Sequence, residues 1–242
     1  MLRTALAAGF AALVGAQAIG ATATIDAQTN IFLASESGTG GGLAPSEEAG
    51  SVYFFDPGED LVLTFSSVTG ETRYSNFSGF FGPDGNGGAI NITSSGGIAG
   101  MRNFRRGFLA GAFLNSEELP TAGNQPSRAN YTLGTITNQD PTFEPQLNQT
   151  FFIGDGVNED GETQLFFVPE GADILVLGFL DGASFVGQPQ NYFDNEGTLE
   201  ATFSIDPLGQ EPVIAPIPLP ATLPLLLAGG LGLAALRRFR RG

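Results

Sequence analysis

The sequence predicts an all-β protein, a β-sandwich of jelly-roll type. In 61–65 and in 199–205, apolar residues occupy every second position, which is typical of an antiparallel strand with one buried face. Glycine, proline, asparagine and aspartate separate the short apolar runs, and no amphipathic helix or fixed-period repeat is visible. Further strands are expected at 51–55, 89–93, 107–114, 131–137, 150–153, 163–168 and 173–180.

The N-terminal segment is typical of a signal peptide. Residues 1–23 contain one early positive charge, Arg3, followed by an apolar run. The run ends in Ala21-Thr22-Ala23, which fits the A-x-A pattern for cleavage. We therefore expect an exported chain that begins at Thr24 and forms one β-sandwich domain over residues 24–214.

The composition of the chain excludes several classes of function. Once both end segments are set aside, five arginines remain against all 25 acidic residues, a net charge of −20. Such a charge opposes binding to nucleic acid. The chain has no cysteine and no histidine, which excludes disulfides, a Ser-His-Asp triad and zinc held by histidine or cysteine.

The C-terminal segment, residues 215–242, joins three different parts. Alternating prolines keep its beginning extended, and an uncharged apolar run, 221–236, follows. At about 16 residues this run is a short transmembrane helix, because roughly 20 residues cross a bilayer. Under the positive-inside rule a basic cluster then forms the cytoplasmic stop. Its members are Arg237, Arg238, Arg240 and Arg241.

This order of parts resembles the VPLPA variant of the PEP-CTERM sorting signal. The motif reads Ile217-Pro218-Leu219-Pro220-Ala221, with Ile217 in place of the usual valine. The resemblance implies processing by an exosortase-type membrane enzyme: the precursor would lie in the inner membrane and the body would reach the cell surface or the extracellular matrix. An ordinary C-terminal membrane anchor is the alternative.

Chemistry in the body concentrates in one loop, residues 181–197. The loop joins a very apolar strand, 174–180, to the strand that begins at Thr198, and it contains Asp181, Asp194 and Asn195. Calcium takes six to eight oxygen ligands in flexible geometry and accepts them from loops. The loop is therefore a candidate calcium site; an asparagine- and aspartate-rich turn without metal is the alternative.

The same loop resembles the metal loop of the small calcium-dependent galactose-binding bacterial lectins, which are jelly-roll sandwiches. The similarity runs from Asp181 through Asn191-Tyr-Phe-Asp-Asn-Glu-Gly-Thr-Leu199, and 55–65 and 82–85 are similar to other turns of that family. The resemblance implies that Asp181, Asp194 and Asn195 bind calcium through side chains and Asn191 through its backbone carbonyl. It also implies one more backbone oxygen, from Tyr74, Phe80 or Phe81.

The chain departs from that family at several positions. Phe193 replaces a small residue, Asp194 an asparagine and Glu196 a serine, the loop after Asp181 is longer, and the histidine of the family's galactose pocket is absent. Added carboxylates favour calcium. Sugar binding depends on the missing histidine more than calcium binding does.

Other acidic residues give weaker signals. In residues 154–162, Gly156 stands where an EF-hand loop needs its first aspartate, so a solvated hairpin loop is expected. No pair of carboxylates stands out as a glycosidase pair. We therefore expect a non-enzymatic surface or matrix protein with a calcium-dependent carbohydrate-binding body. The alternatives are a purely structural matrix or biofilm component and, less favoured, a carbohydrate-active enzyme.

Overall fold

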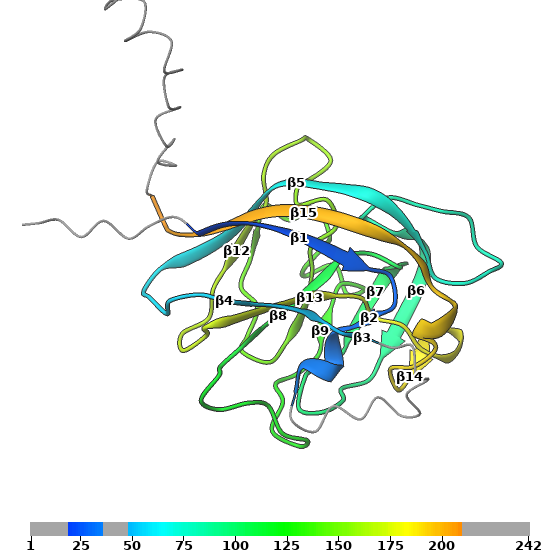
Figure 1. Ribbon diagram of the computed structural model, residues 1–242, viewed down its shortest axis with the longest axis horizontal. Helices are drawn as coiled ribbons and strands as arrows, with labels where there is room; N and C mark the ends of the chain where they lie inside the picture. Colours follow the sequence, from blue (N-terminus) through cyan, green and yellow to red (C-terminus); the bar gives the residue numbers. More distant parts are fainter. Residues whose placement is uncertain (1–18, 36–47, 210–242) are drawn as a thin grey trace, which may run out of the picture. The chain divides into compact units, whose positions relative to one another are not determined.

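The structure is a computed structural model, and it describes residues 19–35 and 48–209 (Figure 1). Within them the fold is all-β and sandwich-like, and its helices are three short 3-10 turns: η1 (Ile31–Ala34), η2 (Ala183–Phe185) and η3 (Tyr192–Asp194). The strands are β1 (Ile19–Asp26), β2 (Thr29–Asn30), β3 (Glu48–Ala49), β4 (Ser51–Phe54), β5 (Leu61–Arg73), β6 (Asn86–Ile92), β7 (Met101–Arg106), β8 (Ala110–Leu114), β9 (Ala129–Asn130), β10 (Thr142–Phe143), β11 (Thr150–Phe152), β12 (Leu165–Phe167), β13 (Ile174–Gly178), β14 (Val186–Gly187) and β15 (Glu196–Pro207).

These strands form several sheets. The largest has the order β1-β15-β5-β12-β10, and a second has the order β11-β8-β13-β4. A third sheet, β14-β6-β7-β9, and the short pair β2-β3 complete the described part. Figure 1 shows β1, β15 and β5 side by side in one layer and β4, β13 and β8 in another.

The two long strands β5 and β15 pair antiparallel over their whole length, with a bulge between Thr202 and Phe203. The period-two pattern of the sequence explains the pairing: Leu199, Ala201, Phe203 and Ile205 are buried, and the residues between them are not. On its other side β15 pairs with β1, from Ile19 opposite Ile205 to Asp26 opposite Thr198.

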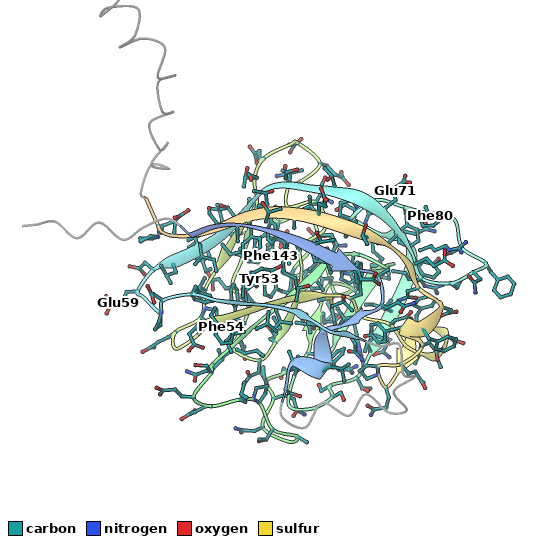
Figure 2. The ribbon with its side chains drawn as sticks, in the orientation of Figure 1. Tyr53, Phe54, Glu59, Glu71, Phe80 and Phe143 are labelled. Carbon is teal, nitrogen blue, oxygen red and sulfur yellow. The ribbon has the colours of Figure 1, made fainter. Side chains whose placement is uncertain are left out.

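Phenylalanine rings connect the two main sheets. Phe166 on β12 is fully buried; its ring stacks on Phe143 and meets Phe65 of its own sheet and Phe151 of the facing one. Tyr53 on β4 meets Phe203 on β15 edge to face. Figure 2 labels both Tyr53, which is partly buried against the core, and Phe143, which is buried in it. With no disulfide available, the fold depends on this aromatic core.

Most expected strands are confirmed, one is wrong, and several strands, β1 and β7 among them, were not expected. Residues 131–137 are not a strand: after β9 the chain turns, Thr132 bonds the Asn130 side chain, and Gly134 adopts a positive φ of 75°. Conversely, β7 forms in Met101–Arg106, where no strand was expected because the arginines make the period-two alternation of buried and exposed residues hard to recognise in the sequence. Met101 and Asn103 are buried, whereas Arg102 and Phe104 face outward.

The predictions for the two end segments compare differently with the structure. Strand β1 begins at Ile19, so the expected cleavage after Ala23 falls inside a strand. The sorting motif, the apolar run 221–236 and the closing arginines lie outside the described residues. Within residues 19–35 and 48–209, no helix is long and apolar enough to cross a membrane.

We expect Phe166→Ala to lower the free energy of unfolding by about 3–5 kcal/mol, because it leaves a cavity among three contacting rings. The matched control is Phe77→Ala, since Phe77 is fully exposed, and its effect should stay within about 0.5 kcal/mol. Urea denaturation of the purified protein measures both. Equal effects of the two substitutions would contradict the described core.

Candidate functional site

The loop between β13 and β15 connects the two main sheets. β13 ends at Gly178, and Asp181 lies three residues later. The chain then forms η2, pairs β14 in parallel with β6, and forms η3 immediately before β15. Asn191 has left-handed backbone angles (φ 74°, ψ 19°), which asparagine adopts more readily than most residues. The loop therefore has a defined conformation, and it is anchored by β13 at one end and by β15 at the other.

Tyr192 ties the two ends of the loop together. Its side chain is fully buried, and its hydroxyl donates to the Phe179 carbonyl (3.2 Å). The same hydroxyl accepts from the Asp181 N–H (3.0 Å). The Asp181 carbonyl in turn accepts from the Gln190 N–H. Asp181 and η3 are thus fixed relative to each other through one phenol.

The turn between β1 and β2 holds the far end of the loop. Asn195 is only 4% exposed, and its Nδ2 donates to the Ala27 carbonyl (3.0 Å). Gln28 Nε2 donates to the carbonyls of Phe193 and Asn195, both at 3.2 Å. Sequence reasoning missed Ala27 and Gln28, because nothing in their identity points to residues more than 160 positions away.

Two neighbouring side-chain oxygens in this loop are buried without a hydrogen bond. They are Oδ1 of Asp194 and Oδ1 of Asn195, and no described protein group donates to either. The nitrogen of the Asn195 amide donates to the Ala27 carbonyl, so the amide oxygen points away from Ala27. Because a buried polar atom without a partner costs about 1–3 kcal/mol, such a pair calls for a ligand or a bound water.

Asn195 and Asp181 line one small cavity, of about 10 Å³. Asp181 is also 4% exposed, and its Oδ1 accepts from the Gly182 N–H at 2.6 Å. A cavity of this size holds roughly one water molecule or ion. Tyr74 also lines the cavity. It is one of the three aromatic residues, with Phe80 and Phe81, that could supply a further backbone oxygen.

Phe80 and Phe81 do not line this cavity. Phe80 projects outward, with Arg73 over its ring (Figure 2). The Phe81 carbonyl accepts from the Thr72 N–H, so its backbone is engaged in pairing with β5. Of the three candidates, Tyr74 is thus the one whose position suits a ligand of the cavity.

One basic residue also lines the cavity, but its charge is paired. Arg73 forms a salt bridge with Glu196 (2.5 Å), its cross-strand neighbour at the start of β15. Gly197 allows this close pairing, because with φ at 99° its Cα approaches the Glu71 carbonyl where a Cβ would collide. Glu196 therefore neutralises the charge of Arg73 at the edge of the cavity.

The candidate ligand atoms of this loop are all oxygens, the ligand type that hard cations prefer. Within residues 19–35 and 48–209, no group of three or more histidine, cysteine, aspartate or glutamate side chains is placed to hold a metal. A metal here would need amide and backbone oxygens beside the two carboxylates. Calcium accepts all three kinds of oxygen, whereas zinc prefers nitrogen and sulfur.

The second acidic loop has a different structure. Asn158 Oδ1 accepts from the N–H groups of Asp160 and Glu162, which closes a hairpin-type turn. Glu159, Asp160 and Glu162 are exposed, and the asparagine oxygen is already satisfied. The loop is therefore the solvated turn expected from its sequence.

Burial raises the pKa of the Asp194 carboxyl above its ordinary value of 3.8, and a backbone hydrogen bond opposes part of that rise. A raised folded-state pKa means that stability is present below the ordinary value and is lost as the pH rises through the folded-state pKa. Asp194→Asn removes this titration. In chelator-containing buffer, we expect the variant to gain stability over the parent at pH 7 and to lose that gain near pH 3.5.

Denaturant melts of the two proteins at a series of pH values measure this difference. Asp160→Asn is the control, because it makes the same change of residue at an exposed position of the hairpin turn. A flat difference for Asp194→Asn would show that burial does not disfavour the charged carboxylate.

Comparison with known proteins assigns no family. The chain matches no protein-family model, no curated protein and no solved structure.

Proposed function

We propose that this protein is an exported cell-surface or extracellular-matrix protein whose body binds calcium in the Asp181–Asn195 loop and, through that ion, a carbohydrate. The observation that carries the proposal is the pair of buried, unpartnered oxygens on Asp194 and Asn195. A calcium ion in the cavity would give the Asn195 oxygen a partner; Asp194 does not line the cavity, and its oxygen would gain a partner only if the ion also reached it. Such contact would also reverse the cost of burying the Asp194 charge.

The proposed ligands come from three places in the chain. Asp181, Asp194 and Asn195 supply side-chain oxygens, Asn191 supplies its backbone carbonyl, and Tyr74 supplies the carbonyl at the end of β5. The hydrogen bonds of Tyr192 and Gln28 support this set, since they hold the loop in place before any ion binds. Such preorganisation suits calcium, which tolerates irregular loop geometry.

Carbohydrate binding rests on the resemblance to the calcium-dependent galactose-binding lectins and on one exposed aromatic residue. The proposal includes the jelly-roll form of the sandwich, which is the fold of those lectins. Phe193 is 54% exposed and directly precedes Asp194, so its ring offers an apolar surface beside the proposed ion. A sugar could bind the ion through its hydroxyls and stack a C–H face on Phe193.

Export and sorting rest on the two end segments. The apolar run and A-x-A sites at the N-terminus support a signal peptide, and residues 217–221, 221–236 and the closing arginines support processing by an exosortase-type enzyme. The acidic, cysteine-free body fits an exported protein that binds cations and not nucleic acid.

We expect calcium to raise the melting temperature of the purified protein and EDTA to reverse the rise. A ligand that binds only the folded state adds RT ln(1 + [L]/Kd), about 2.7 kcal/mol at a hundredfold excess over Kd. Asp181→Asn keeps the shape of the side chain and removes its charge, so it should abolish most of the calcium effect. The measurement is thermal melting, with calorimetric titration of calcium into the stripped protein.

Asp160→Asn is the control for this experiment, since it removes one charge from an exposed turn and should respond to calcium as the parent does. Loss of the calcium response in both variants would mean that calcium acts only through general screening. A glycan array with and without calcium then separates a lectin from a structural matrix protein. Phe193→Ala should weaken sugar binding there and leave the calcium affinity unchanged.

We expect the mature protein to lack its arginine-rich end when it is recovered from outside cells of a host that contains an exosortase-type enzyme. Intact-mass measurement of the exported protein tests this, with a host lacking the enzyme as control. Replacement of Pro218 and Pro220 by alanine should leave the tail attached. Extracellular protein that still contains residues 237–242 would contradict the sorting proposal.

A further inference from the structure

Strand β1 continues without interruption through the bond between Ala23 and Thr24. Its residues pair with β15 in one register, and five of the eight pairs, from Ile19 opposite Ile205 to Ala23 opposite Ala201, lie before that bond. Thr22 and Thr202 also approach across the strands through their hydroxyls (3.4 Å). Nothing in the backbone marks the bond as a boundary.

The side chains of β1 follow the same period-two pattern across that bond. Ala23 is 1% exposed and Ile25 is fully buried, both in the core, and Ala21 packs against it. Gly20, Thr22 and Thr24 face outward. The residues before Thr24 therefore contribute a strand face to the folded domain, which a discarded signal peptide does not do.

Removal of residues 19–23 would damage the largest sheet. β1 is the edge strand next to β15, and only Thr24 to Asp26 would remain paired. The backbone groups of β15 opposite the lost residues would become an open sheet edge, which invites pairing with other chains. Signal cleavage after Ala23 thus conflicts with the fold that contains β1.

A second small-residue site lies directly before β1. Ala16-Gln17-Ala18 also fits the A-x-A pattern, and it would end an 18-residue signal peptide, within the usual 15–30 residues. Cleavage after Ala18 would keep every described residue of β1, from Ile19 to Asp26. The sequence alone does not separate the two sites, whereas the pairing of residues 19–23 with β15 favours cleavage after Ala18.

We propose that the signal peptide is removed between Ala18 and Ile19, so that the mature chain begins at Ile19 and keeps the whole of β1. The step is hydrolysis of one peptide bond: water supplies the hydroxyl of the new Ala18 carboxyl group and a proton of the new Ile19 amine. The proposal rests on the proposed export of the protein and replaces the cleavage after Ala23.

The position of this bond has a consequence for the mature protein. Ile19 lies opposite Ile205, near the end of β15 that leads toward the tail, and Asp26 lies opposite Thr198, near the candidate calcium loop. At about 3.3 Å per residue, the seven residue steps from Ile19 to Asp26 separate these two points by roughly 23 Å. The proposed N-terminus of the mature protein therefore lies toward one end of this sheet, and the candidate site lies toward the other.

The test is N-terminal sequencing of the full-length chain after export by a bacterial host. We expect the sequence Ile-Gly-Ala-Thr. A start at Thr24, or at any residue from 20 to 23, overturns this inference while it leaves export intact. A start at Met1 overturns export and this inference together.

Ala18→Gln provides a second test, because a large side chain at the last position of the A-x-A pattern blocks recognition. We expect the variant to lose the Ile19 start and to accumulate uncleaved precursor or a shifted N-terminus. Gln17→Leu is the matched control, since the middle position of the pattern is unrestricted, and it should keep the Ile19 start. Unchanged cleavage of Ala18→Gln at Ile19 would overturn the assigned recognition site.

Discussion

The hydrogen-bonded pairing of β15 with its two neighbours is the constraint on which the rest of the structure depends. β15 bonds β5 along its whole length on one side and β1 on the other. A slip of one residue would turn Leu199, Ala201 and Phe203 from the core to the surface. The same slip would move Asn195, which directly precedes β15, away from its bond to Ala27. Core and candidate site therefore share one register.

The candidate site depends on how its hydrogen bonds are distributed. The Asn195 nitrogen is used to hold the loop against the β1–β2 turn, and its oxygen is left buried beside Asp181. In the 154–162 hairpin the opposite holds, because the Asn158 oxygen closes the turn and the carboxylates of Glu159, Asp160 and Glu162 are exposed to water. Both loops are acidic, yet only the first combines rigidity with unsatisfied oxygens. That combination, more than the number of acidic residues, distinguishes a cation site from a solvated turn.

Much of the fold could be predicted from the chain, and the failures have physical causes. Strands such as β15 and β13 are strongly patterned or continuously apolar, so local sequence identifies them. β7 was missed because its outward positions hold arginine and phenylalanine, and 131–137 was wrong because Gly134 turns the chain. In the site, Asp181, Asp194 and Asn195 were identifiable from their residue types. Tyr192 was seen as part of a motif, but its role as the tie between loop ends was not.

The sequence by itself determined the all-β class and the acidic, cysteine-free body, and it is the source of the proposed targeting signals and of the candidate calcium loop. These are properties of composition and of neighbours along the chain. Only the tertiary structure decided that Tyr74, and not Phe80 or Phe81, lines the cavity, that Ala27 and Gln28 hold the loop, and that residues 19–23 belong to a strand. Each of these depends on pairing between segments more than 100 residues apart, and local patterns contain no information on which distant strand becomes a neighbour.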